Sequence, residues 1–104
     1  MEIELKSISI NTNIAIHRLK RKGIKNPLEF LRDDLMKNQG IIPNRNTPKG
    51  QMYFVKDQIF LINSMWIYAY YTEGHFDGEL IAKFEIDDSG DISWEVVDYD
   101  DGTK

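Results

Sequence analysis

The chain has 104 residues, of which 41% are hydrophobic and 12% aromatic, and it contains no cysteine. This composition suits one folded domain with a modest core, and it excludes disulfides, thiolate nucleophiles and cysteine-ligated zinc. The net charge is −4, but residues 1–50 carry ten Lys and Arg against five Asp and Glu (+5), whereas residues 51–104 carry three against twelve (−9). Separation of the two signs creates a directional field, which indicates a protein that binds a charged partner.

The first predicted elements are a strand and a helix. Alternating apolar residues predict the strand at residues 3–10, and residues 11–22 predict a helix that stops at Gly23. The N-terminal segment lacks the basic region and the apolar region of a secretion signal. No apolar stretch approaches the ~18 residues of a membrane-spanning helix. We therefore expect a cytoplasmic protein with no membrane partner.

A second helix is predicted to begin at Asn26 and to run to residue 39, before Gly40. In this interpretation Asn26 caps the helix, Pro27 occupies its first turn, and Glu29 reaches back to the cap. The apolar stripe consists of Leu28, Leu31 and Leu35. The polar side has the spacing of two helical salt bridges, Glu29 to Arg32 and Asp33 to Lys37.

The rest of the chain predicts a loop followed by strands. Residues 41–51 are rich in Pro, Asn and Gly and predict a long surface loop. The pair Lys56-Asp57 then predicts a turn, and the wholly apolar residues 59–62 predict a central strand covered on both faces. Further strands are predicted at residues 66–71, 80–86 and 92–96, with a turn at residues 87–91.

These elements predict a single α+β domain that spans residues 1–104. Its N-terminal strand and two helices pack on an antiparallel meander of about four or five strands. Residues 99–104 are expected to leave the fold as an acidic C-terminal tail.

Catalysis has little support in the sequence. His17 and His75 lie in different predicted elements, and no nucleophile or nucleotide-binding motif accompanies them. Glu73, His75 and Asp77 alternate in one segment, a pattern typical of a polar hairpin loop. The acids of residues 87–91 do not fit an EF-hand, because Gly90 comes too early and strands flank the loop. We therefore expect no enzyme activity, no metal site and no cofactor.

A basic cluster ends the first predicted helix, where the helix dipole favours cations. It consists of Arg18, Lys20, Arg21, Lys22 and Lys25. Such a cluster can contact phosphates, so a nucleic-acid-associated regulatory protein is the alternative function. The isoelectric point near 5.1 disfavours this alternative, because the acidic half repels the same polyanion.

Acidic residues flank the last predicted strand at both ends and suggest a partner-binding surface. The predicted set is Asp87, Asp88, Asp91, Asp98, Tyr99, Asp100 and Asp101. Carboxylates attract a basic groove over long range, and tyrosine adds buried contact area. The structural alternative is a solvated acidic edge that prevents pairing between sheets. An edge strand with exposed tyrosines also leaves a homodimer open.

In size, lack of cysteine, acidic balance and acidic carboxyl-terminal meander, the chain resembles the small acidic bacterial immunity proteins of toxin systems such as contact-dependent inhibition. The resemblance implies a non-catalytic inhibitor that occludes the active site of a basic toxin or nuclease. The implied partner is thus a basic protein, such as a cognate nuclease toxin.

Overall fold

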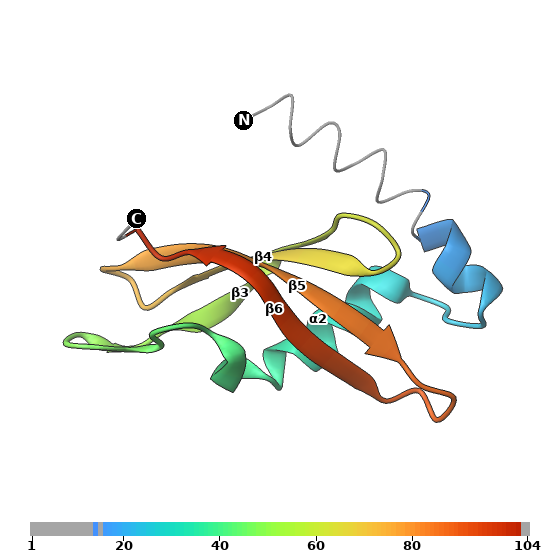
Figure 1. Cartoon of the computed structure of the whole chain (residues 1–104), viewed down its shortest axis with the longest axis horizontal. Coiled ribbons are helices and arrows are strands. Elements are labelled where there is room, and N and C mark those ends of the chain that lie inside the picture. The colour runs from blue at the N-terminus through green and yellow to red at the C-terminus, as the bar shows by residue number, and fades with distance from the viewer. Residues whose placement is uncertain (1–13, 15, 103–104) are drawn as a thin grey trace.

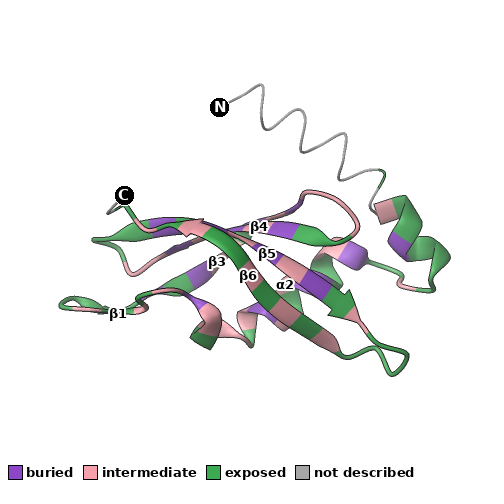
Figure 2. Cartoon of the chain, viewed as in Figure 1, coloured by how far each residue is buried: buried purple, intermediate pink, exposed green. Residues whose placement is uncertain are grey.

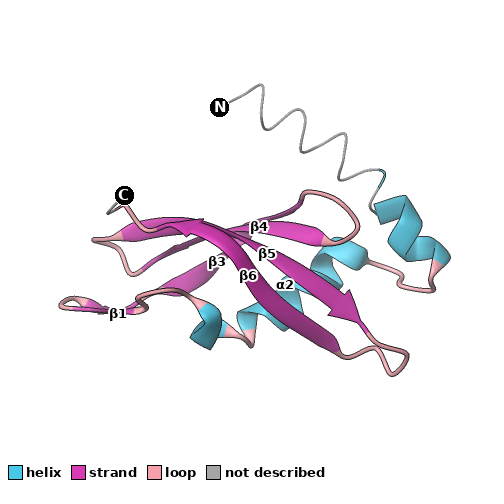
Figure 3. Cartoon of the chain, in the orientation of Figure 1, coloured by secondary structure: helices cyan, strands magenta, loops and turns pink. Residues whose placement is uncertain are grey.

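The computed structural model describes residue 14 and residues 16–102. The strand predicted at residues 3–10 lies outside the described residues. Residues 16–21 are helical, and the further elements are α2 (Pro27–Met36), the 3₁₀ helix η1 (Gln39–Ile41), β1 (Asn46–Thr47), β2 (Gly50–Gln51), β3 (Tyr53–Leu61), β4 (Trp66–Thr72), β5 (Asp77–Ile86) and β6 (Ile92–Asp100). The predicted α+β class, with helices preceding an antiparallel meander, is confirmed (Figures 1 and 3).

Strands β3 to β6 form one antiparallel sheet in the order β3-β4-β5-β6, and β1 and β2 form a separate small hairpin. The segment at residues 41–51, predicted as a long surface loop, therefore contains a short hairpin. The turn predicted at Lys56-Asp57 is wrong, because both residues lie within β3. There the register with β4 shifts between Phe54 and Ile59, so an irregular stretch absorbs the polar pair without reversing the chain.

The wholly apolar residues 59–62 were predicted to form a central strand, yet β3 lies at one edge of the sheet that the described residues form. Ile59 and Leu61 face the core and are fully buried. Phe60 projects to the opposite face, where its ring stacks on Tyr68 and lies under the Arg32 guanidinium. Stacking by neighbouring side chains, rather than a second covering layer, therefore explains the apolar residue on that face.

Helix α2 covers one face of the sheet (Figure 1). Leu31 and Leu35 are fully buried and Leu28 is partly buried, so the predicted apolar stripe is confirmed. Six inward-facing side chains of the two central strands are at most 3% exposed: Ile67, Ala69 and Tyr71 on β4, and Leu80, Ala82 and Phe84 on β5. Ile86, at the end of β5, is partly buried. We call the side of the sheet that α2 covers the inner face.

The polar side chains of α2 bind the sheet rather than one another. Glu29 and Asp33 both contact Nζ of Lys56 on β3, at 2.7 and 2.6 Å, and these hydrogen bonds raise the pKa of Lys56 to about 12. The predicted pairs within the helix are therefore wrong. At the other edge of the sheet, Asp34 accepts a 2.8 Å hydrogen bond from the indole N–H of Trp94 on β6. Helix α2 is thus connected to β3 and β6, the first and last strands in the sheet order.

Helix α2 begins where predicted, but its cap and its C-terminal end differ from the prediction. Pro27 occupies the first turn as expected, but the side chain of Asn26 makes no capping hydrogen bond within the described residues. The α-helix ends at Met36, and residues 39–41 continue as a 3₁₀ turn. The amide oxygen of Gln39 accepts the backbone N–H of Phe54 at 2.8 Å, which ties this turn to the start of β3.

The acidic tail begins later than predicted. Strand β6 continues to Asp100, and Tyr99 packs against the core instead of leaving the fold. Asp101 follows the strand and accepts a 2.8 Å hydrogen bond from the side-chain amide of Asn44. The C-terminal acids are therefore partly fixed by the sheet.

Candidate protein-binding surface

The face of the sheet that points away from α2 combines aromatic and acidic side chains. Because directly paired residues share a face, the register assigns each strand's contribution to it. We call these residues the outer face: Phe60, Trp66, Tyr68, Tyr70, Glu79, Ile81, Lys83, Glu95, Asp98 and Asp100. These residues include four carboxylates and one ammonium group, and the same register adds the carboxylates of Asp77 and Glu85, so the charge of the described outer face is negative.

Two tyrosines are fixed on the outer face by neighbouring carboxylates. The hydroxyl of Tyr68 donates to Oε2 of Glu79 at 2.8 Å, and that of Tyr70 donates to Oδ2 of Asp77 at 2.9 Å. Burial together with the Glu79 hydrogen bond raises the pKa of Tyr68, and the Asp77 hydrogen bond together with burial raises that of Tyr70. Both rings are therefore neutral and held in defined positions at neutral pH.

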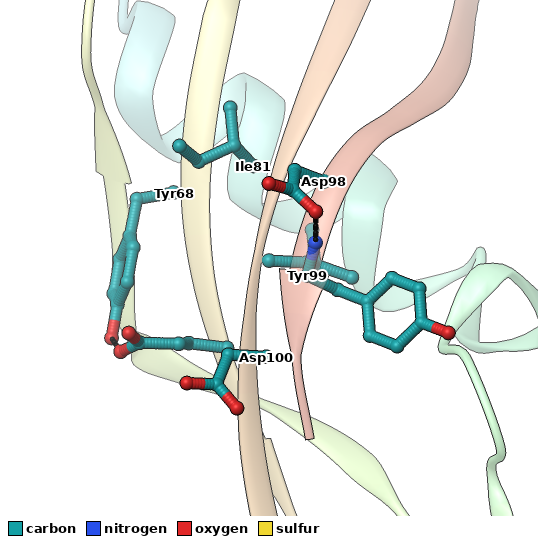
Figure 4. Close-up of a pocket in the computed structure, with 7 residues that line it drawn as sticks. Tyr68, Ile81, Asp98, Tyr99 and Asp100 are labelled. Atoms are coloured by element: carbon teal, nitrogen blue, oxygen red, sulfur yellow. Dashed lines mark hydrogen bonds between the residues drawn. The ribbon is translucent and has the colours of Figure 1, made fainter. Parts of the chain in front are cut away.

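A shallow cavity of about 350 Å³ lies on this face. Figure 4 shows Tyr68, Ile81, Asp98 and Asp100 around it, with the ring of Tyr99 directed away to the other side of the strand. Glu79 completes the acidic lining. Carboxylates beside an aromatic ring and an isoleucine can accept a lysine or arginine side chain, whose stem is apolar and whose head is cationic.

The structure divides the predicted acidic set into two groups. Asp98 and Asp100 lie on the outer face, whereas Tyr99 faces the core and Asp101 contacts Asn44. The remaining predicted acids, Asp87, Asp88 and Asp91, lie in the turn between β5 and β6. The seven residue steps from Asp91 to Asp98, at ~3.3 Å each, place the two groups roughly 23 Å apart, at opposite ends of β6 (Figure 1).

The turn acids have a structural role. Oδ1 of Asp87 accepts the backbone N–H groups of Ser89 and Asp91, each at 2.9 Å, and Gly90 adopts a positive φ of 87°. Asp87 therefore stabilises the turn itself. This leaves Asp98 and Asp100 as the predicted acids that join the aromatic surface.

Sequence reasoning missed the residues that neighbouring strands contribute to the surface. Tyr68 and Tyr70 alternate along β4, and Glu79 and Ile81 alternate along β5. Alternation alone indicates that each pair shares one face of its strand. The register of three strands is needed to place the two pairs beside Asp98 and Asp100.

The predicted basic residues lie elsewhere. Arg18, Lys20, Arg21, Lys22 and Lys25 are all exposed, on the helical residues 16–21 and the segment that follows them. In Figure 1 this helix lies at the end of the molecule opposite the C-terminus. The basic residues are therefore far from Asp98 and Asp100, whereas Lys22 lines a cavity together with Asp87 and Asp88 of the turn.

The histidines do not assemble a site within the described residues. His17 is exposed, and His75 contacts Glu73 in the loop between β4 and β5, with 3.2 Å between Nδ1 and Oε2. Burial raises the pKa of Glu73, but hydrogen bonds from Phe76 and His75 outweigh it and lower the pKa overall. No group of three or more His, Asp or Glu side chains in the described part of the chain could hold a metal ion.

No helix among the described residues is long and apolar enough to cross a membrane. In comparisons with known proteins, no family model, no curated protein and no solved structure matches the chain.

Proposed function

We propose that this protein is a non-catalytic binding protein whose outer face docks on a basic partner protein. The observation that carries the proposal is the convergence of Tyr68, Glu79, Asp98 and Asp100 from three strands around one open cavity. Carboxylates speed association with a cationic surface, and tyrosines supply contact area at low entropic cost. The combination favours protein recognition over catalysis.

The most specific form of this proposal is an immunity protein that occludes the basic active site of a toxin or nuclease. A cationic site that binds phosphates matches the charge of the outer face, and a lysine or arginine of that site matches the cavity. The two ordered tyrosines support it further, because interface hot spots favour aromatic residues that are already held in place. The inhibitor would act by covering the site, so it needs no reactive group of its own.

The test begins by capturing a partner from the native host on the immobilised chain and measuring its binding kinetics. Asp98→Asn combined with Asp100→Asn should slow association several-fold at low salt, because the lost charges are exposed and steer the encounter. The matched control is Asp57→Asn combined with Asp88→Asn, two exposed acids that do not line the cavity. For an immunity protein, the captured partner must be toxic or nucleolytic, and one equivalent of the chain must inhibit it.

Comparing the outer-face variant with the control variant shows whether binding depends on a defined site. Equal effects of both would indicate general electrostatic attraction without a defined site. An association rate that changes neither with salt concentration nor with either variant would contradict the proposal.

A nucleic-acid-associated protein is the alternative, and the exposure of all five basic residues in residues 18–25 favours it. Retention on a DNA or RNA column at physiological salt would support this function. Reversing the charges of Lys20, Arg21 and Lys22 should then abolish retention, whereas the outer-face variant should not.

A further inference from the structure

The sheet has two edges, and the edge formed by β3 is covered. Nε of Arg32 on α2 donates to the carbonyl oxygen of Ile59 at 2.8 Å, and its guanidinium lies 5.6 Å from the ring centroid of Phe60. Lys56 on the same strand is held by two carboxylates of α2. Together with the irregular register between Phe54 and Ile59, these contacts prevent a further strand from pairing along β3.

The other edge is formed by β6, and no such cover is present among the described residues. The sheet order ends at β6, whose strand neighbour is β5. Pairing with β5 is regular at residues 92–96, and Val97 is the extra residue of a bulge that ends this stretch. We call residues 92–96 the edge segment.

The core is incompletely covered at the edge segment. Its inward-facing side chains, Ile92, Trp94 and Val96, pack against the core but stay partly exposed, as the green and pink β6 ribbon in Figure 2 illustrates. At the opposite edge, Ile59 and Leu61 are 0% exposed. A further strand beside β6 would therefore bury apolar surface of these side chains that is still exposed in the described structure.

The backbone of the edge segment also offers hydrogen-bonding groups. The N–H of Asp87 donates to the carbonyl oxygen of Asp91 at 2.9 Å, which marks a hydrogen-bonded pair beside the turn. In an antiparallel ladder such pairs alternate with pairs whose N–H and C=O groups point outward. The alternation directs the backbone groups of Ile92, Trp94 and Val96 away from β5.

The charge of the segment selects the kind of strand that can pair with it. Ser93 and Glu95 are exposed on the outer side, Asp91 precedes the segment, and Asp98 follows it. Nζ of the adjacent Lys83 lies 3.7 Å from Glu85. A second copy of the chain would bring these acids against their own equivalents, which is unfavourable in cross-strand pairs. A strand with basic outer side chains is complementary.

We propose that the edge segment binds an extended strand of the partner in which lysine or arginine alternates with apolar residues. The apolar side chains would cover Ile92, Trp94 and Val96, and the basic side chains would lie beside Glu95 on the outer face. This inference rests on the proposed function, and it specifies how the partner is engaged, namely by strand addition to the sheet.

The probe is a synthetic peptide in which lysine alternates with valine, and its control carries backbone N-methyl groups at alternate residues. N-methylation keeps the charge but removes the donors that a strand needs. Nuclear magnetic resonance of the full chain should show slowed amide exchange at Ile92, Trp94 and Val96 with the first peptide only. Glu95→Lys should weaken binding about tenfold, whereas Asp57→Lys, the same charge change on β3, should not.

Three results would overturn strand addition. One is equal binding of both peptides with signal changes confined to Tyr68 and Tyr70, which would leave the proposed outer-face function intact. Another is protection of the three amides in the free protein, or a dimer by light scattering, because the edge would then be occupied already. The third is no binding of either peptide; capture of the natural partner then tests the proposed function separately.

Discussion

The two faces of the sheet come from the same strands but serve different purposes. On the inner face, Ile67, Ala69 and Tyr71 of β4 are fully buried beneath α2. On the outer face, the residues between them, Tyr68 and Tyr70, are partly exposed and donate their hydroxyl groups to carboxylates. Because side chains alternate along a strand, the inner set can specify the fold while the outer set stays available for recognition. Substitutions on the two faces should therefore differ in kind.

The largest effect is expected from Leu31→Asp. Leu31 is 0% exposed, so the substitution buries an unpaired carboxylate and should cost several kcal/mol of a total stability of about 5–15 kcal/mol. Chemical or thermal unfolding measures the loss. The matched control is Phe30→Asp, which introduces the same carboxylate at a position of the same helix that is 38% exposed. An unchanged unfolding midpoint for Leu31→Asp would contradict the placement of α2 on the sheet.

A second inner-face test is Gly78→Ala. Gly78 pairs directly with Tyr71, and a Cβ at Gly78 would lie 2.6 Å from three atoms of the Tyr71 side chain. The ring must therefore move within a closed core, at an expected cost of about 1–3 kcal/mol. Gly40→Ala is the control, because nothing lies within 4 Å of its Cβ position. Equal unfolding midpoints for the two variants would contradict the tight contact.

Local spacing predicts the inner face well but predicts the contacts between elements poorly. The Leu31 and Leu35 stripe and the turn at residues 87–91 follow from patterns within a few residues. The partner of Glu29 does not, because Lys56 lies 27 residues further along the chain. Helical spacing instead favoured Arg32, which binds the β3 backbone. Side-chain pairing is decided by packing geometry, which local periodicity does not contain.

The composition of the candidate surface is likewise only partly predictable from local spacing. Asp98 and Asp100 were predicted from acidic clustering, and both lie on the outer face. Their aromatic neighbours were missed because they lie two strands away. Tyr68 pairs with Ile81, which pairs with Asp98, and Tyr70 pairs with Glu79, which pairs with Asp100. A shift of one residue in either register would exchange the faces of the whole strand. The composition of a sheet surface therefore requires the register as well as the strands.

Tyr71→Phe tests a polar atom within the inner face. The Tyr71 hydroxyl is buried and has no hydrogen-bond partner among the described residues, and burial followed by the nearby charge of Asp101 raises its pKa to about 12. Removing a buried, unsatisfied hydroxyl should leave stability unchanged or raise it by about 1 kcal/mol. Thermal unfolding decides between these outcomes. A clear loss of stability would instead indicate a partner outside the described residues.

The smallest effects on stability, within about 1 kcal/mol, are expected on the outer face, from Asp77→Asn and Glu79→Gln. Their clearer signature is in titration. The folded state raises the pKa values of Tyr68 and Tyr70 above 10.0, so it favours their neutral forms. The stability linked to these pairs is therefore fully present below pH 10 and is lost as the pH rises through the folded-state pKa values.

The causes of the two shifts differ, which separates the two variants. The hydrogen bond to Asp77 is the largest cause for Tyr70, whereas burial is the largest cause for Tyr68 and the Glu79 hydrogen bond comes second. Asp77→Asn should therefore remove a larger share of the Tyr70 pKa shift than Glu79→Gln removes of the Tyr68 pKa shift. Ring resonances of labelled tyrosine, followed through an alkaline titration, measure both values, and Asp57→Asn serves as a remote control. Loss of most of the Tyr68 pKa shift in Glu79→Gln would mean that burial is not its main cause and that the Tyr68 ring is more open to water than the sheet geometry indicates. The cavity beside it would then be a poorer site for a lysine or arginine side chain.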